Sequence, residues 1–278
     1  MIIMQSPAKV NLFLRVLGKR SDGYHDILSI IQRISLYDEM SFDLKGNGIK
    51  VVCPGGLAPG NKNNIAYRAA EAVLSNKSCY SGVEITINKR IPVAAGLGGG
   101  SSNAATTLVT LNEMTGTKYS TEELMQMGAK LGADVPFFVF GKTALASGIG
   151  DRLKQVEAVP KLWFILINPG FEISTGDIYG NLNLGLTKEP IKYSMPRFVT
   201  MSHIAKELYN DLEKVSLRFY PVLSDIKKLL TANGALGSLM SGSGPTVFGV
   251  FRNEADAKRA ECNLREARIG SVFRACSI

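Results

Sequence analysis

The chain has 278 residues, a mass of 30.0 kDa and a formal net charge of +8. Apolar residues make up 45% of it and charged residues 20%, a globular composition that rules out a largely disordered chain. At about 100–200 residues per domain, this length allows one large domain or two of moderate size.

No apolar run approaches the roughly 18 residues that a membrane-spanning helix requires. The longest runs from Leu162 to Ile167, and Lys9 and Arg15 interrupt the apolar N-terminal stretch, so this stretch does not resemble a secretory signal peptide. We therefore expect a cytoplasmic protein without membrane contact. No CxxC pair occurs, which argues against a disulfide framework or a zinc site; the cysteines are Cys53, Cys79, Cys262 and Cys276.

The excess of basic residues permits two kinds of partner, nucleic acids or small polyanions such as nucleotides and phosphorylated metabolites. Proteins that bind nucleic acids usually concentrate their charge in a stripe. Here the basic residues are spread out, and the tightest group is the pair Lys19-Arg20. We favour small anions, although a generic soluble surface accounts for the charge nearly as well.

The N-terminal part of the chain is predicted to be rich in strands. Apolar and polar residues alternate over 9–16, which predicts a half-buried strand with Lys9 and Asn11 on one face. The elements expected after it are a polar turn at 18–25 and strands at 27–37 and 40–53, the latter broken at 46–48.

The middle of the chain is predicted to place helices on both sides of a glycine-rich loop. Ser120 and Glu123 form a capping box that opens one helix, and Gly132 is expected to close it. The other elements expected here are a helix at 64–75, a strand at 83–91 that Pro92 stops, and a helix at 103–114.

A domain boundary is predicted near Pro160, which gives domains at 1–159 and 160–278. After it, the order strand, helices, strand, strand, helix, strand is that of an α+β sandwich of ferredoxin-like type. These elements are a strand at 162–167, a turn at 168–170, an irregular stretch with Pro190 and Pro196, helices at 201–219 and 222–232, two short strands flanking 241–245, a helix at 254–268 and a strand from 271.

The strongest functional signal is the glycine-rich loop between a predicted strand and a predicted helix. Its glycines let the backbone approach a bulky group and adopt positive φ angles. Ser101 or Ser102 is expected to cap the helix, whose first N–H groups and dipole favour an anion. The loop predicts a phosphate site, with a glycine-rich turn that binds nothing as the alternative. Its residues are Pro92, Val93, Ala94, Ala95, Gly96, Leu97, Gly98, Gly99, Gly100, Ser101 and Ser102.

Known fingerprints do not fit the loops of this chain. Gly141-Lys142-Thr143 would end a Walker A motif, but Pro136 stands where that motif needs glycine. The GxGxxG pattern fails because Ser101 follows the glycines, and no GxSxG elbow is present, which weighs against an α/β-hydrolase. His25 and His203 are the only histidines, which excludes a histidine-rich metal site.

Three further features are ambiguous when taken singly. Ser241 to Thr246 form a second glycine loop, which would either wall the same phosphate pocket or be only a tight hairpin. Asp134 lies in a short loop among apolar neighbours, as a helix cap or as a partly buried carboxylate with a purpose. Lys9 would ordinarily be a solvated strand lysine.

Taken together, five segments resemble the GHMP kinase superfamily. The glycine loop alone indicates the superfamily, and two N-terminal segments resemble its branch that acts on a cytidine-diphosphate-linked methylerythritol. The resemblance spans positions 6 to 246 and is carried by Ser6 to Leu14, Asp22 to His25, Pro92 to Ala105, Leu131 to Pro136 and Ser241 to Pro245.

This resemblance implies an α+β, two-domain GHMP-kinase-like fold. An N-terminal ribosomal-protein-S5-like α/β domain would adjoin a C-terminal ferredoxin-like α+β domain, with the active site in the cleft between them. The implied activity is ATP-dependent phosphoryl transfer, with Mg²⁺, to the 2-hydroxyl of that substrate, in the non-mevalonate route to isoprenoid precursors. The partners would then be small molecules and not nucleic acid.

The same resemblance assigns roles to residues. Lys9 and Asp134 would be the catalytic pair, and the 92–102 loop would hold the ATP phosphates, with the Ser102 hydroxyl as a candidate Mg²⁺ ligand. Asn64 and Lys89 would lie near the adenosine. The residues facing the substrate would be Asn11, Tyr24 with its ring stacked on cytosine, His25 at the cytosine edge, Thr175 and Tyr179.

Two rival interpretations stay open at this stage. A kinase for another small alcohol, or a decarboxylase that phosphorylates its substrate first, would share these motifs. A basic nucleotide- or RNA-binding protein without turnover would fit the charge and the Tyr24-His25 pair, although no RNP-like aromatic pattern is present.

Overall fold

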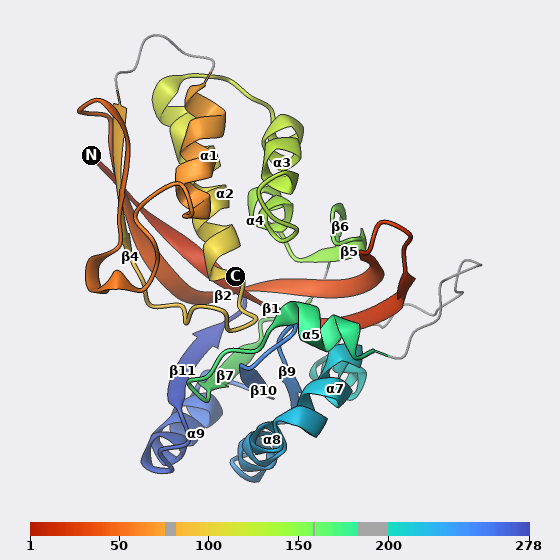
Figure 1. Ribbon diagram of the computed structural model, residues 1–278. Helices are drawn as coiled ribbons and strands as arrows, with labels where there is room; N and C mark the ends of the chain where they lie inside the picture. Colours follow the sequence, from red (N-terminus) through yellow and green to blue (C-terminus); the bar gives the residue numbers. More distant parts are fainter. Residues whose placement is uncertain (76–81, 158, 183–199) are drawn as a thin grey trace. The chain divides into compact units, whose positions relative to one another are not determined.

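The computed structural model describes residues 1–75, 82–157, 159–182 and 200–278 (Figure 1). These residues form two compact units, each assembled from separate stretches of chain. The first unit comprises Met1–Ala8, Leu36–Val93 and Gly98–Lys142, and the second comprises Lys9–Ser35, Ala94–Leu97 and Thr143–Ile278. The units cut across the domains expected at 1–159 and 160–278, and that division stays a prediction. Cys79, Pro190 and Pro196 lie outside the described residues.

Strands and helices are interspersed along the described chain. The strands are β1 (Ile2–Lys19), β2 (His25–Asp43), β3 (Gly48–Val52), β4 (Gly82–Asn88), β5 (Ala144–Gly148), β6 (Arg152–Gln155), β7 (Trp163–Asn168), β8 (Tyr209–Asn210), β9 (Gly237–Met240), β10 (Val247–Phe251) and β11 (Ser271–Cys276). The helices are α1 (Ile65–Leu74), α2 (Gly99–Thr115), α3 (Thr121–Ala129), α4 (Val135–Phe140), α5 (Thr175–Gly180), α6 (Met201–Glu207), α7 (Asp211–Phe219), α8 (Val222–Ala232) and α9 (Glu254–Glu266), with a short 3₁₀ turn, η1 (Pro54–Gly56).

The first unit contains helices α1 to α4 together with strands β3 and β4 and parts of β1 and β2. β4 pairs in parallel with β3 and antiparallel with residues 39–43 of β2. Helices α1 and α2 lie side by side (Figure 1). α1 forms because Asn64 caps its first turn and apolar residues recur at helical spacing, so that one face is buried; these residues are Ala66, Ala69, Ala70 and Val73.

The second unit contains a four-stranded antiparallel sheet in the order β11-β7-β10-β9. Helices α8 and α9 pack against its strands (Figure 1). In chain order the strands are β7, β9, β10 and β11, so the β-α-β-β-α-β arrangement expected from the sequence is confirmed. In the same unit, residues 27–31 of β2 pair with β5, and β8 pairs in parallel with residues 13–14 of β1.

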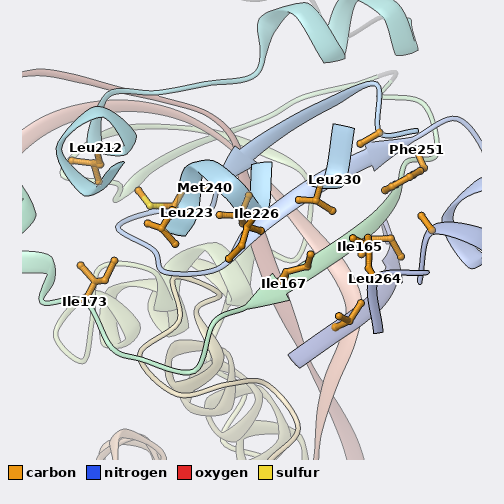
Figure 2. Packing of buried hydrophobic residues seen from close by; sticks show 14 of the residues in the cluster. Ile165, Ile167, Ile173, Leu212, Leu223, Ile226, Leu230, Met240, Phe251 and Leu264 are labelled. Carbon is orange, nitrogen blue, oxygen red and sulfur yellow. The ribbon is translucent and has the colours of Figure 1, made fainter. Parts of the chain in front are cut away.

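One apolar cluster fills the second unit between its sheet and its helices. Figure 2 shows Ile165 and Ile167 of β7 among Leu223, Ile226 and Leu230 of α8. All five side chains are almost fully buried, and burial of each contributes about 1.5–3 kcal/mol relative to exposure. This core supports both β10 and the short β9, the strands that flank the second glycine loop.

One expectation about a single element proves wrong in the C-terminal part of the second unit. The helix expected over 201–219 is two helices, α6 and α7, separated by β8. The break arises because Tyr209 and Asn210 pair with Phe13 and Leu14 of β1, which requires extended backbone.

The N-terminal strands are also longer than the alternating pattern predicts. The strand expected at 9–16 is β1 (Ile2–Lys19), and β2 (His25–Asp43) runs through the break expected between 37 and 40. Asp38 lies within this expected break, and a buried charge within a strand is unusual. Its carboxylate is fully buried and accepts hydrogen bonds from N–H donors, so the strand continues through it.

Candidate active site

Lys9 belongs to the second unit, and its side chain is buried on β1. Its ammonium donates to Asn11 Oδ1 at 2.6 Å, which confirms that the two side chains share a face of the strand. Asn11 in turn donates to Ser29 Oγ at 2.8 Å, and Ser29 donates to the carbonyl of Phe13. The alternative that Lys9 is a solvated strand lysine is therefore wrong, because its side chain is buried and a chain of hydrogen bonds fixes its position.

The first half of the glycine-rich loop packs beside Lys9 in the same unit. The Lys9 N–H donates to the Leu97 carbonyl at 3.0 Å. Ser241 Oγ donates to the Gly96 carbonyl at 2.9 Å, and the Thr246 N–H approaches the Ala95 carbonyl at 3.4 Å. The second glycine loop is therefore bonded to the first one, and of the two roles considered for it, a wall of the same site fits better than an isolated hairpin.

Glycines allow these two loops to touch. A Cβ at Gly96, whose φ is +75°, would collide with the Ser241 carbonyl oxygen. A Cβ at Gly242 would lie 3.3 Å from Lys9 Nζ and 3.4 Å from Asn11 Oδ1. The main chain of the second loop therefore passes close to the buried ammonium, and a side chain at either position would push the loops apart.

Asn210 is a residue of this site that sequence analysis missed. Its amide Nδ2 donates to the carbonyls of Met240 at 2.9 Å and of Gly242 at 2.7 Å. Its Oδ1 accepts from the Leu212 N–H and thereby caps α7. The only signal in the sequence was an asparagine before an acidic helix start, which indicates a cap but not the loop that the amide also holds.

The second half of the glycine-rich loop belongs to the first unit and opens α2. The helix begins at Gly99, four residues before the start expected at 103. Gly98, with left-handed backbone, occupies the N-cap position, so the prediction that Ser101 or Ser102 caps the helix is wrong. The early start is possible because Gly99 has no side chain; a Cβ there would lie 3.0 Å from Ile91 Cγ2 and 3.1 Å from Lys89 Nζ.

The backbone around α2 has the features of an anion site. Left-handed residues recur at alternate positions, namely Ala94 (φ 50°), Gly96 (φ 75°) and Gly98 (φ 68°). The first turn of α2 carries no acidic residue, so the positive end of the helix dipole is not neutralised there.

Asp134 lies at the start of α4 in the first unit, in the loop that follows α3. The capping box of Ser120 and Glu123 opens α3 as expected, but the helix ends at Ala129 with Lys130 as its C-cap, so Gly132 does not close it. Asp134 occupies the N-cap position of α4 without a capping hydrogen bond from its side chain, which does not support the cap interpretation. A Cβ at Gly132 would lie 3.8 Å from Ser101 Oγ, so this loop borders the first turn of α2.

Lys9 and Asp134 belong to different units, so their pairing stays a prediction. The same holds for the two residues expected near adenosine, for which the structure gives local partners. Asn64 caps α1 and donates to the Pro59 carbonyl at 2.7 Å. Lys89 forms a buried ion pair with Asp38 and also donates to Asn103.

The residues expected to face the substrate lie partly together in the second unit. The rings of His25 and Tyr179 are in contact, with centroids 4.9 Å apart and a 36° tilt. Thr175, in the first turn of α5, shares a 2.8 Å hydrogen bond with Ser243 of the second glycine loop. Tyr24 is 59% exposed, with its backbone N–H bonded to Asp22. An exposed ring beside His25 is open to a planar ligand, and its stacking role stays a prediction.

Protein ligands for a metal ion are few in the part of the chain that the structure describes. No group of three or more His, Cys, Asp or Glu side chains that could hold a cation occurs there. The Ser102 hydroxyl is fully buried and accepts a hydrogen bond from Ser6 Oγ at 2.8 Å, so it does not fit the role of an open Mg²⁺ ligand. Cys53, Cys262 and Cys276 are free thiols, and none of the described helices is long and apolar enough to cross a membrane.

Comparison with known families and proteins gives consistent matches along the chain. Residues 64–142 match the GHMP kinases N terminal domain and residues 195–269 the GHMP kinases C terminal domain. A 4-diphosphocytidyl-2-C-methyl-D-erythritol kinase of Syntrophus aciditrophicus (strain SB) is 57% identical over 278 residues, 100% of both chains. One from Syntrophotalea carbinolica (strain DSM 2380 / NBRC 103641 / GraBd1) is 49% identical over 93% of this chain and 92% of the relative.

Solved structures agree with these matches. The chain is similar to a crystal structure of 4-(cytidine 5'-diphospho)-2C-methyl-D-erythritol kinase, with a TM-score of 0.85 and 34% identity over 99% of both chains. It is also similar to a homoserine kinase from Cytophaga hutchinsonii ATCC 33406, with a TM-score of 0.72 and 19% identity over 100% of this chain and 94% of the other. The second likeness shows a shared fold alone.

Proposed function

Since this chain belongs to the family of 4-diphosphocytidyl-2-C-methyl-D-erythritol kinases, within the GHMP kinases, it is a phosphotransferase, and we propose the following reaction. The γ-phosphoryl group of ATP is transferred to the 2-hydroxyl of 4-diphosphocytidyl-2-C-methyl-D-erythritol, in the non-mevalonate route to isoprenoid precursors. The observation that carries the proposal is the match to these kinases over the full length of both chains. A cytoplasmic location, where ATP is available, belongs to the same proposal.

The glycine-rich loop is proposed to hold the ATP phosphates. Phosphoryl transfer depends on alignment and charge neutralisation more than on covalent help from the protein. Left-handed backbone at Gly96 and Gly98, and the first turn of α2, supply main-chain donors for this purpose. Mg²⁺, when bound with the nucleotide, would offset the negative charge of its phosphates.

Lys9 and Asp134 are proposed as the pair that acts on the transferred group. Asp134 accepts or orients the proton of the attacking hydroxyl, and Lys9 offsets the negative charge of the γ-phosphate. The hydrogen bond from Lys9 to Asn11 supports this proposal, because it holds the ammonium in one orientation.

Tyr24 is proposed to stack on the cytosine of the substrate. Replacement of Tyr24 by alanine is expected to raise KM for the cytidine substrate about 5–150-fold, since a stacked base is worth about 1–3 kcal/mol. Tyr24→Phe keeps the ring and serves as the matched control, with little change expected. Initial rates at varied acceptor concentration measure the effect, and an unchanged KM in Tyr24→Ala would place the cytosine pocket elsewhere.

His25 gives the proposed pocket a dependence on pH. Burial lowers the pKa of its imidazole from 6.5, and the nearby charge of Lys19 lowers it further, so the neutral form prevails at pH 7. Because the pKa of His25 is lower in the folded protein than in the unfolded chain, the unfolded chain takes up the proton first as the pH falls. The folded state therefore loses stability as the pH falls from 6.5 toward the pKa of the folded state. We expect KM for the acceptor to rise on acidification from about pH 7 to pH 5. His25→Gln should flatten this rise, and an unaltered profile in that variant would assign the titration to another group.

A coupled assay tests the proposed reaction directly. ADP production is measured with ATP, Mg²⁺ and either the cytidine-diphosphate substrate or a panel of small alcohols such as homoserine and mevalonate. We expect turnover with the cytidine substrate alone. Turnover with another alcohol would overturn the proposed acceptor, and salt-dependent RNA binding without any ADP production would support a nucleic-acid-binding protein instead.

A further inference from the structure

The fully buried carboxylate of Asp38 has no part in the reaction proposed above. It lies within β2 in the first unit, and its side chain is 0% exposed. Burial of a charge is costly unless ion pairing and hydrogen bonds compensate it. The hydrogen-bond donors around the Asp38 carboxylate therefore indicate its role.

One oxygen of Asp38 holds the segment that enters the glycine-rich loop. Oδ1 accepts the backbone N–H of Arg90 at 2.7 Å and that of Ile91 at 2.9 Å. These residues follow β4 and directly precede Pro92, the first residue of the loop. The carboxylate thus fixes the main chain at the loop entrance.

The other oxygen holds the helix that leaves the loop. Oδ2 accepts from Asn103 Nδ2 at 3.0 Å, and Asn103 directly follows Ser102, the last residue of the loop. The Lys89 ammonium donates to this same oxygen and, at 3.2 Å, to Asn103 Oδ1, so carboxylate, ammonium and amide form a closed triangle.

A hydroxyl pair extends this network to the loop itself. Asn103 Nδ2 also donates to Ser6 Oγ at 3.0 Å, and Ser6 Oγ donates to Ser102 Oγ at 2.8 Å. Ser6, Ser102 and Asn103 are all buried, so water competes little for these hydrogen bonds.

From this geometry we infer that Asp38 is a positioning residue for the ATP phosphate loop, because a single carboxylate binds the main chain before residue 92 and the side chain after residue 102. The inference rests on the proposed function in one respect, that the loop holds the phosphates of ATP. A buried ion pair contributes little to stability compared with well-packed apolar residues, whereas it fixes geometry through directed hydrogen bonds. We call the Asp38 carboxylate and the groups that it binds, those of Lys89, Arg90, Ile91 and Asn103, the clamp. Loss of the clamp should therefore weaken nucleotide binding.

Two variants divide the clamp into its parts. Asp38→Asn keeps an acceptor for Arg90 and Ile91 but turns an amide donor toward the Lys89 ammonium and Asn103. Asn103→Ala removes the helix side alone, leaves the Asp38–Lys89 pair intact, and serves if Asp38→Asn does not fold. Hydrogen exchange of the segment 89–104 and the Kd for ADP are measured on each full-length variant.

We expect both variants to raise hydrogen exchange in this segment and to weaken ADP binding about tenfold or more, because misplacement by about 1 Å is enough to cost that much. KM for ATP should rise in parallel, while KM for the phosphoryl acceptor stays unchanged. If Asp38 had only a structural role, its replacement would not raise KM for ATP while leaving KM for the acceptor unchanged.

Two control variants exclude trivial causes. Asp43→Asn removes an aspartate of the same strand that pairs with Lys45 at the surface at 2.8 Å, and should change nothing. Val73→Ala in α1 destabilises the core of the same unit without touching the clamp, so it reports what lost stability alone does.

The outcomes separate this inference from the proposed function. Unchanged exchange and an unchanged ADP Kd in folded Asp38→Asn, or in Asn103→Ala if the former does not fold, would overturn the inference. The inference would also be overturned if Val73→Ala, at a loss of stability equal to that of the clamp variants, weakened ADP binding as much as they do. Absence of phosphoryl transfer by the wild-type protein, with ADP binding intact, would instead overturn the proposed acceptor and leave the positioning role standing.

Discussion

Replacement of Asp134 by asparagine is expected to lower kcat by a factor of about 10²–10⁴, the range that a positioned acid–base group contributes. Asparagine keeps the shape of the side chain but removes both the negative charge and the ability to take up a proton. ATP should still bind, because the proposed phosphate donors are those of the loop at 92–102 and the first turn of α2, which the change leaves in place. Single-turnover rates and the Kd for ADP, measured on the same preparation, separate the two effects.

Replacement of Lys9 is also expected to lower kcat, but for an electrostatic reason. Lys9→Ala removes the ammonium that is proposed to offset charge on the γ-phosphate, and loss of one such electrostatic contact costs about 10²–10³ in kcat. Both Lys9→Ala and Lys9→Met leave Asn11 Oδ1 without its 2.6 Å donor. Lys9→Met also retains the apolar stem and so avoids a cavity, which makes it the better variant for comparison. Turnover near that of the wild type in Asp134→Asn or in Lys9→Met would remove that residue from the mechanism.

Features fixed by local sequence were predictable. The capping box at Ser120 and Glu123, the helix expected at 64–75 and the strand expected at 162–167 depend on residues within a few positions of one another, and all three occur close to where the pattern indicates. The position of Lys9 and Asn11 on one face follows from the period of two in a strand. The ferredoxin-like order of elements was predictable for the same reason, because each element carries its own periodicity.

Features fixed by distant partners were not predictable. The carboxylate of Asp38 reaches Ile91 across 53 positions, and the Asn210 amide reaches Gly242 across 32. Each would ordinarily be interpreted as a strand break or a helix cap, because polar residues of these types compete locally for backbone groups. The start of α2 within the glycines has a similar origin, since it depends on Ile91 and Lys89 lying against Gly99.

The close approach of the two glycine loops leads to a further large effect. Gly96→Ala is expected to lower kcat/KM about 100-fold or more, since misplacement of a phosphate-binding group by about 1 Å suffices for such a loss. The new Cβ would collide with the Ser241 carbonyl oxygen and lie 3.1 Å from both N and O of Gly244. These are main-chain atoms held by hydrogen bonds, so relief requires that the loops separate.

Gly46→Ala provides a matched control for the backbone conformation. Its φ of +71° is close to the +75° of Gly96, but a Cβ there meets nothing within 4 Å. Both variants share the left-handed strain of about 1–2 kcal/mol that a non-glycine residue carries, and thermal unfolding should reveal it in each. Only Gly96→Ala adds the collision, so the difference in kcat/KM between the two variants isolates the contact with the second loop. Equal activity in both would mean that the second loop can move away without disturbing the bound phosphates, and its role as a wall of the site would have to be given up.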